Sequence, residues 1–337
     1  MTGGAGFLGG HFVADHLARF PDDHVIVLDA LTYAASLESL PEEVRRSPRF
    51  EFVYGNVRSP LLVESLVSRA DVVVHFAAET HVPRSISDNL IFFETDVLGT
   101  QTLASAVVRH RQRIERFVHV STSEVYGTAE RDPMAEDHPL SPRTPYAAAK
   151  CGADRLVWAF ACTYELPAVI VRPFNNYGPR QHLEKLVPRL ATSALLGEPL
   201  TLHGAGQAAR DWIHVTDTVR GIEAVLAAPI ERVRGEVFNL GTGIATDVLT
   251  IAREVLALTG RGEELLTTTP ERPGQVAMHR ADPRKARDVL GFVPERKLAE
   301  GLAETVAWYR DNRAFWERLR WMRSVPVTAA DGTVTYW

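Results

Sequence analysis

The feature that most limits what this chain can fold into is the glycine-rich turn at its start, Gly3–Gly9, with the sequence Gly-Gly-Ala-Gly-Phe-Leu-Gly. Glycines at every third position let backbone amides approach a pyrophosphate at the amino end of a helix, and an apolar-periodic helix follows through Arg19. Val25–Leu28 then reads as a buried strand, which Asp29 closes 20 residues after Gly9. Because a carboxylate there accepts from ribose hydroxyls and repels a 2′-phosphate, the pattern predicts bound NAD rather than NADP.

Only Met1 and Thr2 precede this turn, although the glycine turn of a dinucleotide-binding fold follows a buried strand. That strand lies in the middle of a doubly wound sheet, so its loss would leave two neighbouring strands unpaired. We therefore expect the native chain to start upstream of Met1, with a valine codon read as the initiator. A chain that begins at Met1 is expected to lose both stability and cofactor affinity.

The rest of the first half alternates strands and helices, which predicts an α/β fold with a doubly wound parallel sheet of the Rossmann type. Apolar runs typical of strands covered on both faces occupy 50–54, 72–78, 117–120 and 168–174, and helices are expected at about 89–109 and 147–164. We assign residues 1–175 to an NAD-binding domain and 176–337 mainly to a smaller α/β substrate lobe. Residues 211–245 are expected to return partly to the first domain, with 236–240 as a candidate strand.

Two polar stretches near the middle of the chain carry the candidate chemistry. Thr122, Ser123 and Glu124 follow an apolar strand directly, so they should lie at its carboxyl end, where open α/β sheets bind their ligands. Tyr146 and Lys150 are four residues apart at the start of a helical run, which stacks them on one helix face. An ammonium beside a phenol favours the phenolate, so these groups can take a proton from an alcohol while hydride leaves its carbon.

With these motifs in this order, the chain resembles the extended short-chain dehydrogenase/reductases of the nucleotide-sugar epimerase/dehydratase family, nearly from end to end. The loop 79–86 and the segments 175–176 and 184–186 resemble the dTDP-glucose 4,6-dehydratases most closely. The resemblance implies that NAD is bound by Gly3, Gly6, Phe7, Leu8, Gly9, Asp29, Leu31, Thr32, Asn56, Val57, Phe76, Ala77, Ala78, Thr95, Tyr146, Lys150 and Asn176. It implies that a nucleotide diphosphate sugar is contacted by Thr80, His81, Arg84, Thr122, Asn175, Lys185, Leu186, Thr201, His203, Arg210, Asn239 and Arg272.

The reaction implied by this resemblance begins with oxidation of the sugar at C4. Tyr146, assisted by Thr122 and Lys150, would take the C4 hydroxyl proton, and Glu124 would take the C5 proton as the C6 hydroxyl leaves. The stored hydride would return to C6 and give a 4-keto-6-deoxy sugar with NAD regenerated. Ser123 departs from the pattern, because dTDP-glucose dehydratases typically have there an aspartate, which donates a proton to the departing hydroxyl.

Three other functions remain open at this point. Thr-Ser-Glu also occurs in UDP-glucuronate decarboxylases, where the C4 ketone makes the carboxylate a β-keto acid that loses CO2. A 4-epimerase needs only Tyr146, Lys150 and room for the ketone to turn over. A non-catalytic NAD-binding protein is the remaining alternative, which the complete set of Thr122, Glu124, Tyr146 and Lys150 argues against.

Composition excludes several other classes of protein. A net charge of -5 leaves no basic excess for nucleic acid, and no apolar run approaches the roughly 18 residues of a membrane span. Cys151 and Cys162 lie about 16 Å apart on one predicted helix, too far for a disulfide, so we expect reduced cysteines in a cytoplasmic protein. The histidines form no metal signature, so we expect no metal, and His75, His119 and His214 read as core residues. A homodimer through helices 89–109 and 147–163 is implied by the resemblance.

Overall fold

The computed structural model describes residues 1–271, 274–328 and 334–336 of the chain. Its main sheet is parallel, with the order β3-β4-β5-β9 and with β1 paired to β2 beside it. The strands are β1 (Val25–Asp29), β2 (Phe50–Tyr54), β3 (Val72–His75), β4 (Arg116–Val120), β5 (Ala168–Pro173) and β9 (Val237–Leu240). The predicted α/β class and the return of 236–240 to the first sheet are therefore confirmed.

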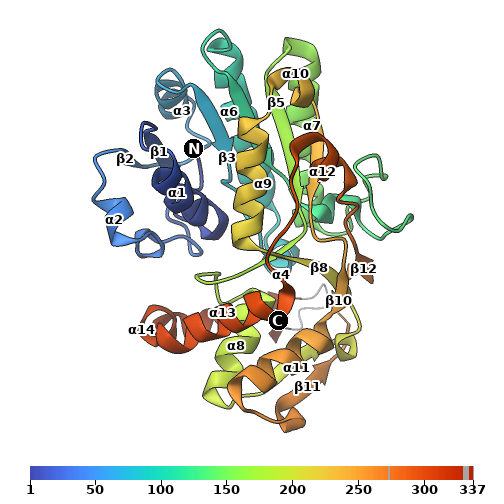
Figure 1. Ribbon diagram of the computed structural model, residues 1–337. Helices are drawn as coiled ribbons and strands as arrows, with labels where there is room; N and C mark the ends of the chain where they lie inside the picture. The colour runs from blue at the N-terminus through green and yellow to red at the C-terminus, as the bar shows by residue number, and fades with distance from the viewer. Residues whose placement is uncertain (272–273, 329–333, 337) are drawn as a thin grey trace.

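Helices cover both faces of this sheet because the strands are apolar on both sides. On one face lie α1 (Phe7–Arg19) and α9 (Val215–Ala227), which pack against Val74, Val118 and Val169 (Figure 1). On the other lie α3 (Pro60–Val67), α6 (Gly99–Arg109) and α7 (Pro145–Tyr164), which pack against Val73, Phe117 and Ile170. The short helices α2 (Glu42–Arg45) and α10 (Ile230–Val233) lie outside these two layers.

A second lobe, in the lower half of Figure 1, packs around its own apolar cluster of helices α8 (Leu186–Leu196), α11 (Val248–Thr259) and α13 (Leu298–Asp311). Its strands are β6 (Asn175–Tyr177), β8 (Ala209–His214), β10 (Ala245–Asp247) and β12 (Met278–His279) in one sheet, and β7 (Leu200–His203) with β11 (Leu266–Thr269) in another. The chain continues through α12 (Arg284–Leu290) before α13, and through α14 (Arg313–Trp316), β13 (Pro326–Thr328) and β14 (Val334–Tyr336) after it.

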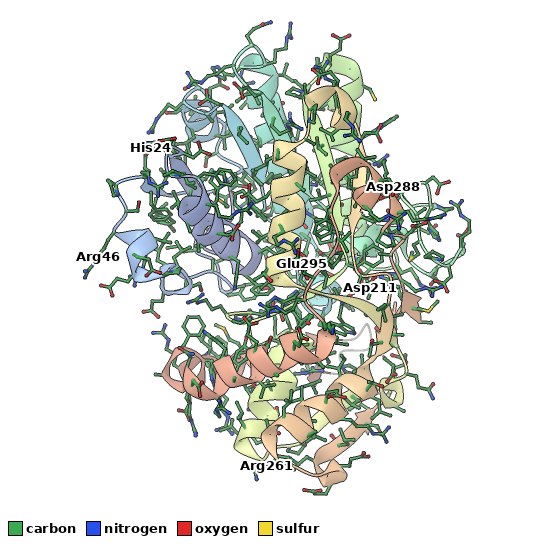
Figure 2. All side chains as sticks on the ribbon, in the orientation of Figure 1. His24, Arg46, Asp211, Arg261, Asp288 and Glu295 are labelled. Atoms are coloured by element: carbon green, nitrogen blue, oxygen red, sulfur yellow. The ribbon has the colours of Figure 1, made fainter. Side chains whose placement is uncertain are left out.

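Asp211, which is labelled in Figure 2, lies on β8 and bonds to the loops after β9 and β12. Its Oδ1 accepts the N–H of Thr242 at 2.8 Å, and its Oδ2 accepts those of Gly243 at 2.7 Å and Ala281 at 3.2 Å. Three backbone donors on one buried carboxylate hold the strand firmly. The neighbouring residue, Arg210, lies on the same anchored strand.

The predicted helix over 89–109 is confirmed as a continuous helical run over 90–109, in which three consecutive segments differ in their hydrogen-bond pattern. These are α5 (Leu90–Phe92), the π-helical turn η2 (Phe93–Leu98) and α6. The π-helical turn ends just before Gly99, where an added Cβ would lie 2.5 Å from Cγ1 of Val57, so the helix approaches the neighbouring loop closely at this residue. Wide turns of this kind are frequent at functional sites.

Met1 and Thr2 lie between β1 and β3. The Met1 amino group donates to the Ile26 carbonyl at 2.6 Å, and Thr2 pairs with both Leu28 and His75. Among the described residues no regular strand fills the remainder of this slot, so the expected gap in the sheet is present. It is a cavity of about 540 Å³ whose apolar lining includes Phe12, Val63, Val67, Val73, Leu103 and Leu226.

No helix in the described part of the chain is long and apolar enough to cross a membrane. Cys151 and Cys162 are free and both lie on α7, as expected. His75, His119 and His214 are buried, which confirms them as core residues. The residues that the structure describes contain no group of three or more His, Cys, Asp or Glu that could hold a metal ion.

Filling the slot between β1 and β3 should stabilise the protein. Fusing Lys-Val-Leu-Ile before Met1 should raise the free energy of unfolding by about 2 kcal/mol, since each buried aliphatic side chain contributes about 1.5–3 kcal/mol and ordering each residue costs about 1–2 kcal/mol. Urea denaturation of the fused and unfused chains measures the difference. A polar extension of equal length, Lys-Ser-Gly-Asp, is the control and should give no gain; equal stability of all three chains would contradict the prediction.

Candidate active site

A cleft of about 450 Å³ lies at the carboxyl ends of the strands of the main sheet, where it meets the second lobe. Its walls come from the glycine turn, the ends of β1, β3, β4 and β5, the start of α7 and the start of α8. This is the edge at which parallel α/β sheets bind ligands, because the strand ends leave a crevice there.

The glycine turn is shaped so that its backbone lies against the neighbouring strand. Gly3 has a φ of 72°, and a Cβ there would lie 2.6 Å from the Ala77 nitrogen. A Cβ on Gly9, at the start of α1, would lie 2.2 Å from the Gly3 carbonyl oxygen. Only glycine fits either position, so the turn exposes backbone amides at the helix amino end, as a pyrophosphate requires.

Asp29 closes β1 and faces the same end of the cleft. Its Oδ2 accepts the N–H of Ala5 at 2.9 Å and its Oδ1 accepts that of Leu31 at 2.8 Å. Burial raises the pKa of Asp29, and these two hydrogen bonds lower it. The carboxylate is held in place by the turn and retains lone pairs for a ribose, so the residues present fit NAD.

The start of α7 sets the position of Tyr146 and Lys150. Thr144 is the N-cap, its hydroxyl accepting the N–H of Ala147 at 3.2 Å, and Pro145 occupies the first turn. These are strong start signals for a helix, so Tyr146 falls in the first turn and Lys150 one turn later. Both side chains are buried and line the cleft.

Thr122 is the group that holds the phenol of Tyr146. It caps the 3₁₀ turn η3 (Ser123–Tyr126), accepting the N–H of Glu124 at 3.2 Å, and its hydroxyl is also hydrogen-bonded to Tyr146. Burial raises the pKa of Tyr146 above its ordinary value, whereas the Thr122 hydrogen bond lowers it. The carboxylates of Asp96 and Glu124 raise it further.

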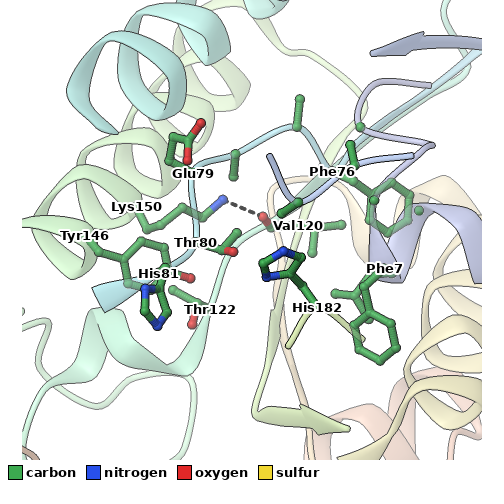
Figure 3. Close-up of a pocket in the computed structure, with 18 of the residues that line it drawn as sticks. Phe7, Phe76, Glu79, Thr80, His81, Val120, Thr122, Tyr146, Lys150 and His182 are labelled. Atoms are coloured by element: carbon green, nitrogen blue, oxygen red, sulfur yellow. Dashed lines mark hydrogen bonds between the residues drawn. The ribbon is translucent and has the colours of Figure 1, made fainter. Parts of the chain in front are cut away.

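Lys150 is anchored at the end of a strand of the main sheet. Its Nζ donates to the Val120 carbonyl at 2.8 Å, at the last residue of β4 (Figure 3). Burial lowers its pKa, and the carboxylates of Asp96 and Asp154 raise it. The ammonium therefore interacts with two buried carboxylates as well as with the end of β4.

Ser123 and Glu124 lie above a buried histidine that the sequence did not point to. His279 donates Nε2–H to the Gly127 carbonyl at 2.7 Å, which leaves Nδ1 as the acceptor, 3.5 Å from the Ser123 hydroxyl and 4.0 Å from Oε1 of Glu124. Burial lowers the pKa of His279, so the neutral ring is favoured. Arg210 also acts electrostatically on Glu124 and lines the same part of the cleft.

The far wall of the cleft is a polar network that includes Thr80, His81 and Lys185. Lys185 donates to the Thr80 carbonyl at 2.6 Å, and the buried Glu184 accepts from Arg84 at 2.9 Å and from Tyr33 at 3.1 Å. The guanidinium of Arg84 also lies 4.0 Å above the Tyr33 ring. Burial, with the nearby Glu184, raises the pKa of Glu79 to about 7.

Most of the predicted site residues line this one cleft. They are Gly3, Gly6, Phe7, Leu8, Gly9, Asp29, Thr32, Asn56, Val57, Phe76, Ala77, Ala78, Thr80, His81, Thr95, Thr122, Ser123, Glu124, Tyr146, Lys150, Asn175, Asn176, Lys185, Leu186 and Arg210. The cleft also includes Gln181, His182, Glu184 and Ile91, to which the sequence analysis assigned no role. Gln181, His182 and Glu184 come shortly before the predicted Lys185 in the chain. This proximity is the one sequence signal that could have indicated them.

The remaining predicted residues lie elsewhere. Asn239 is in the core, where its amide accepts from Tyr126 and donates to the Met134 carbonyl, so we correct its assignment as a substrate contact. Thr201 and His203 point into a separate cavity of about 800 Å³ between α8, β7 and the turn η6 (Glu317–Arg323). Leu31 and Arg84 do not line the cleft: the N–H of Leu31 donates to Asp29, and Arg84 donates to Glu184. Arg272 lies outside the described residues.

A dinucleotide-type glycine turn beside a Thr/Tyr/Lys group at the edge of a parallel sheet defines an NAD-dependent enzyme of the short-chain dehydrogenase/reductase class. The chain belongs to the family described as GDP-mannose 4,6-dehydratase, whose model matches residues 1–305.

Similar proteins agree with this assignment. A dTDP-glucose 4,6-dehydratase of Streptomyces niveus is 41% identical over 324 residues, which cover 95% of each chain. The crystal structure of DesIV, a dTDP-glucose 4,6-dehydratase of Streptomyces venezuelae with NAD and dTDP bound, has a TM-score of 0.90 and 42% identity over 94% of this chain and 98% of DesIV. A UDP-glucose 4-epimerase of Thermotoga maritima, solved with UDP-glucose, has a TM-score of 0.84 and 30% identity over 93% and 98% of the two chains.

Two adjacent glycines of α1 offer a matched test of the cofactor site. Gly9→Ala should weaken NAD binding at least about tenfold, equivalent to about 1.4 kcal/mol, because the new Cβ would push the Gly3 carbonyl and distort the turn. Gly10→Ala should leave NAD affinity unchanged, since its Cβ would meet no atom nearer than 3.6 Å. Calorimetric titration with NAD, on variants shown by circular dichroism to be folded, measures both; equal affinities would contradict the assignment.

Proposed function

We propose that this protein is an NAD-dependent dTDP-glucose 4,6-dehydratase that produces a nucleotide-linked 4-keto-6-deoxy sugar. The observation that carries the proposal is that one cleft contains both the glycine turn with Asp29 and the group Thr122, Glu124, Tyr146 and Lys150. A site for hydride storage and a site for proton removal therefore face a common space, which alcohol oxidation at a sugar carbon requires.

The cofactor is held by residues from two sides of the cleft. The Gly3–Gly9 turn receives the pyrophosphate, Asp29 the adenosine ribose, and Asn56 and Val57 lie where the adenine would be bound. Bound there, NAD would supply the hydride acceptor for oxidation at C4 and the hydride donor for reduction at C6, so no net change of the cofactor would result.

Oxidation at C4 depends on Tyr146. Its phenolate oxygen accepts the proton of the C4 hydroxyl, and the hydrogen bond with Thr122 stabilises the charged oxygen. Burial opposes formation of the phenolate, so nearby positive charge is needed to offset it. Lys150, one helical turn away, supplies that charge.

Elimination depends on Glu124. The C4 ketone makes the C5 hydrogen acidic, and the carboxylate accepts that proton as the C6 hydroxyl leaves. Tyr146 and Glu124 each take up one proton from the sugar. One proton then returns to the departing hydroxyl and one to C5, so the net change in the sugar is the loss of one water. Because Ser123 is too weak an acid for this step, Glu124 is the group that returns the proton to the hydroxyl.

Arg210 and Lys185 are the cations suited to the nucleotide diphosphate. Arg210 is almost fully buried at the edge of the cleft, and its guanidinium can donate two parallel hydrogen bonds to phosphate oxygens. Lys185 is the N-cap residue of α8, so a phosphate beside it would also meet the amino end of that helix.

Ser123 favours a second candidate, in which C4 oxidation is not followed by dehydration. Neither alternative reaction requires a stronger acid at position 123. A 4-epimerase needs only Tyr146 and Lys150, and a UDP-glucuronate decarboxylase needs no acid at C6. Product mass separates the three, since dehydration removes about 18 Da, decarboxylation about 44 Da and epimerisation nothing.

Two variants test the division of roles on dTDP-glucose. Tyr146→Phe should lower kcat by about 10²–10⁴-fold because it removes the base for the first step. Glu124→Gln should allow absorbance of the reduced cofactor to appear but should block dehydration and exchange of the C5 hydrogen with deuterated water. Mass spectrometry of the product and the absorbance of the reduced cofactor are the measurements.

The matched control is Tyr164→Phe, at an exposed tyrosine at the far end of the same helix, which should retain the parent rate. Retained turnover in Tyr146→Phe would remove Tyr146 from the mechanism. A product of unchanged mass from the parent enzyme would favour the epimerase, and a loss of about 44 Da from UDP-glucuronate would favour the decarboxylase.

We also propose that the protein is a cytoplasmic homodimer, in which η2 and α7 pack against a second copy. Phe93, Leu98 and Trp158 are exposed on these helices, at 40%, 55% and 44% respectively. Large apolar side chains gathered on neighbouring helices are typical of interfaces between identical chains.

Trp158→Glu should convert the dimer to a monomer, because a charge would have to be buried without a partner. Sedimentation velocity at several concentrations measures the mass. Trp321→Glu is the control, since Trp321 is exposed in η6 and away from these helices, and it should stay dimeric. A monomeric parent protein at all concentrations would contradict the proposal.

A further inference from the structure

Asn56, in the turn after β2, lines the adenosine end of the cleft together with Asp29. Its Oδ1 accepts the backbone N–H of Arg58 at 2.9 Å and the Nε–H of the same arginine at 3.3 Å. Because a backbone N–H can only donate, the amide atom that faces it is the oxygen and not the nitrogen. The two ends of the Asn56 amide are therefore distinguished by their partners.

Arg58 is held in place on its far side, so its contact with Asn56 is fixed. Its Nη1 forms an ion pair with Glu94 of η2. The backbone carbonyl of Asn56 accepts the N–H of Ser59 at 3.0 Å, and Ser59 is the N-cap residue of α3. Turning the amide over would set its N–H groups against the two N–H donors of Arg58 and leave these donors without an acceptor, which is costly.

The nitrogen is therefore the end of the Asn56 amide that is left for the cleft. Nothing in the described part of the chain forms a hydrogen bond with this Nδ2. Both lone pairs of Oδ1 are used by Arg58, and an amide nitrogen carries two donors and no acceptor. The side chain can recognise a hydrogen-bond acceptor on a bound base, but it cannot accept from an amino group.

We propose that Asn56 sets the base specificity of the cofactor site, because it offers a hydrogen-bond donor where a carboxylate would offer an acceptor. The edge of adenine carries an exocyclic amino group, which donates, whereas a 6-keto purine carries an oxygen there, which accepts. Since Asn56 cannot select the amino group, the site binds a dinucleotide with a 6-keto purine about as well as it binds NAD.

This inference goes beyond the assignment of NAD to the cleft. The Gly3–Gly9 turn and Asp29 recognise the pyrophosphate and the ribose, which are common to both dinucleotides. Discrimination between them therefore depends on the groups that meet the edge of the base. The inference concerns cofactor binding alone, so it holds whichever reaction the bound nucleotide sugar undergoes.

The test is a competition between NAD and nicotinamide hypoxanthine dinucleotide, which has a keto oxygen in place of the adenine amino group. The protein is dialysed against an equimolar mixture until the bound ratio no longer changes, and the bound dinucleotides are then released by heat and measured by chromatography. The parent protein should hold the keto analogue at no less than about one third of the amount of NAD, because no acceptor favours the amino group. A larger excess of NAD overturns the proposal.

Two variants change the group that faces the base. Asn56→Asp keeps an oxygen for Arg58 and replaces the amide nitrogen by a second oxygen. It should shift the bound ratio at least about tenfold towards NAD, because a carboxylate accepts from the amino group and repels the keto oxygen. Asn56→Ala removes the donor and should shift the ratio in the same direction by a smaller factor.

The matched control is Asn89→Asp, which adds the same charge at an exposed residue before α5 that does not line the cleft. It should leave the ratio unchanged. Damage to the fold cannot imitate the expected shift, because a loss of affinity common to both dinucleotides leaves their ratio as it was.

The remaining outcomes are equally decisive. An unmoved ratio in both Asn56 variants overturns the proposal, as does an equal shift in Asn89→Asp or a parent protein that binds neither dinucleotide. A protein that shows the expected ratios but turns over no nucleotide sugar supports the role of Asn56 and shows that the proposed dehydratase function has failed.

Discussion

The hydrogen bond between Lys150 and the Val120 carbonyl is the interaction on which the geometry of the site depends. It joins the catalytic helix α7 to the last residue of β4, and so places the first turn of that helix against Thr122 and η3. Burying an ammonium in this position is costly, and the cost is offset by one carbonyl acceptor and by the negative charge of Asp96 and Asp154. Tyr146 thereby meets Thr122 at the wall of the cleft, with its side chain largely buried.

The second lobe serves the site through a few anchored residues. Asp211 binds three backbone N–H groups and fixes β8, so Arg210 faces Glu124 across the cleft. On the opposite wall Glu184 holds Arg84 and Tyr33, which links the start of α8 to the first domain. The cleft is therefore lined by groups whose orientation is set by buried hydrogen bonds, which is the preorganisation that proton transfer requires.

Much of the site could be predicted because its signals are local. The Gly3–Gly9 turn, the strand before Asp29 and the Tyr146/Lys150 spacing each depend on a few consecutive residues whose backbone preferences are strong. Asn239 was misplaced because its neighbours in space, Tyr126 and Met134, are more than a hundred residues away in the chain. His279 was missed for the same reason: it acquires a role only through contacts with side chains from other elements.

By itself the sequence determined the class of fold, the cofactor and the four groups that can perform chemistry, because glycine turns, apolar strands and helix caps act over short distances. Only the tertiary structure decided how those groups influence one another. Lys150, predicted from its spacing to Tyr146, also bonds to the Val120 carbonyl and interacts with the buried carboxylates of Asp96 and Asp154, partners that the sequence did not indicate. Charge states in a buried site are properties of the whole packed neighbourhood, which no short stretch of sequence contains.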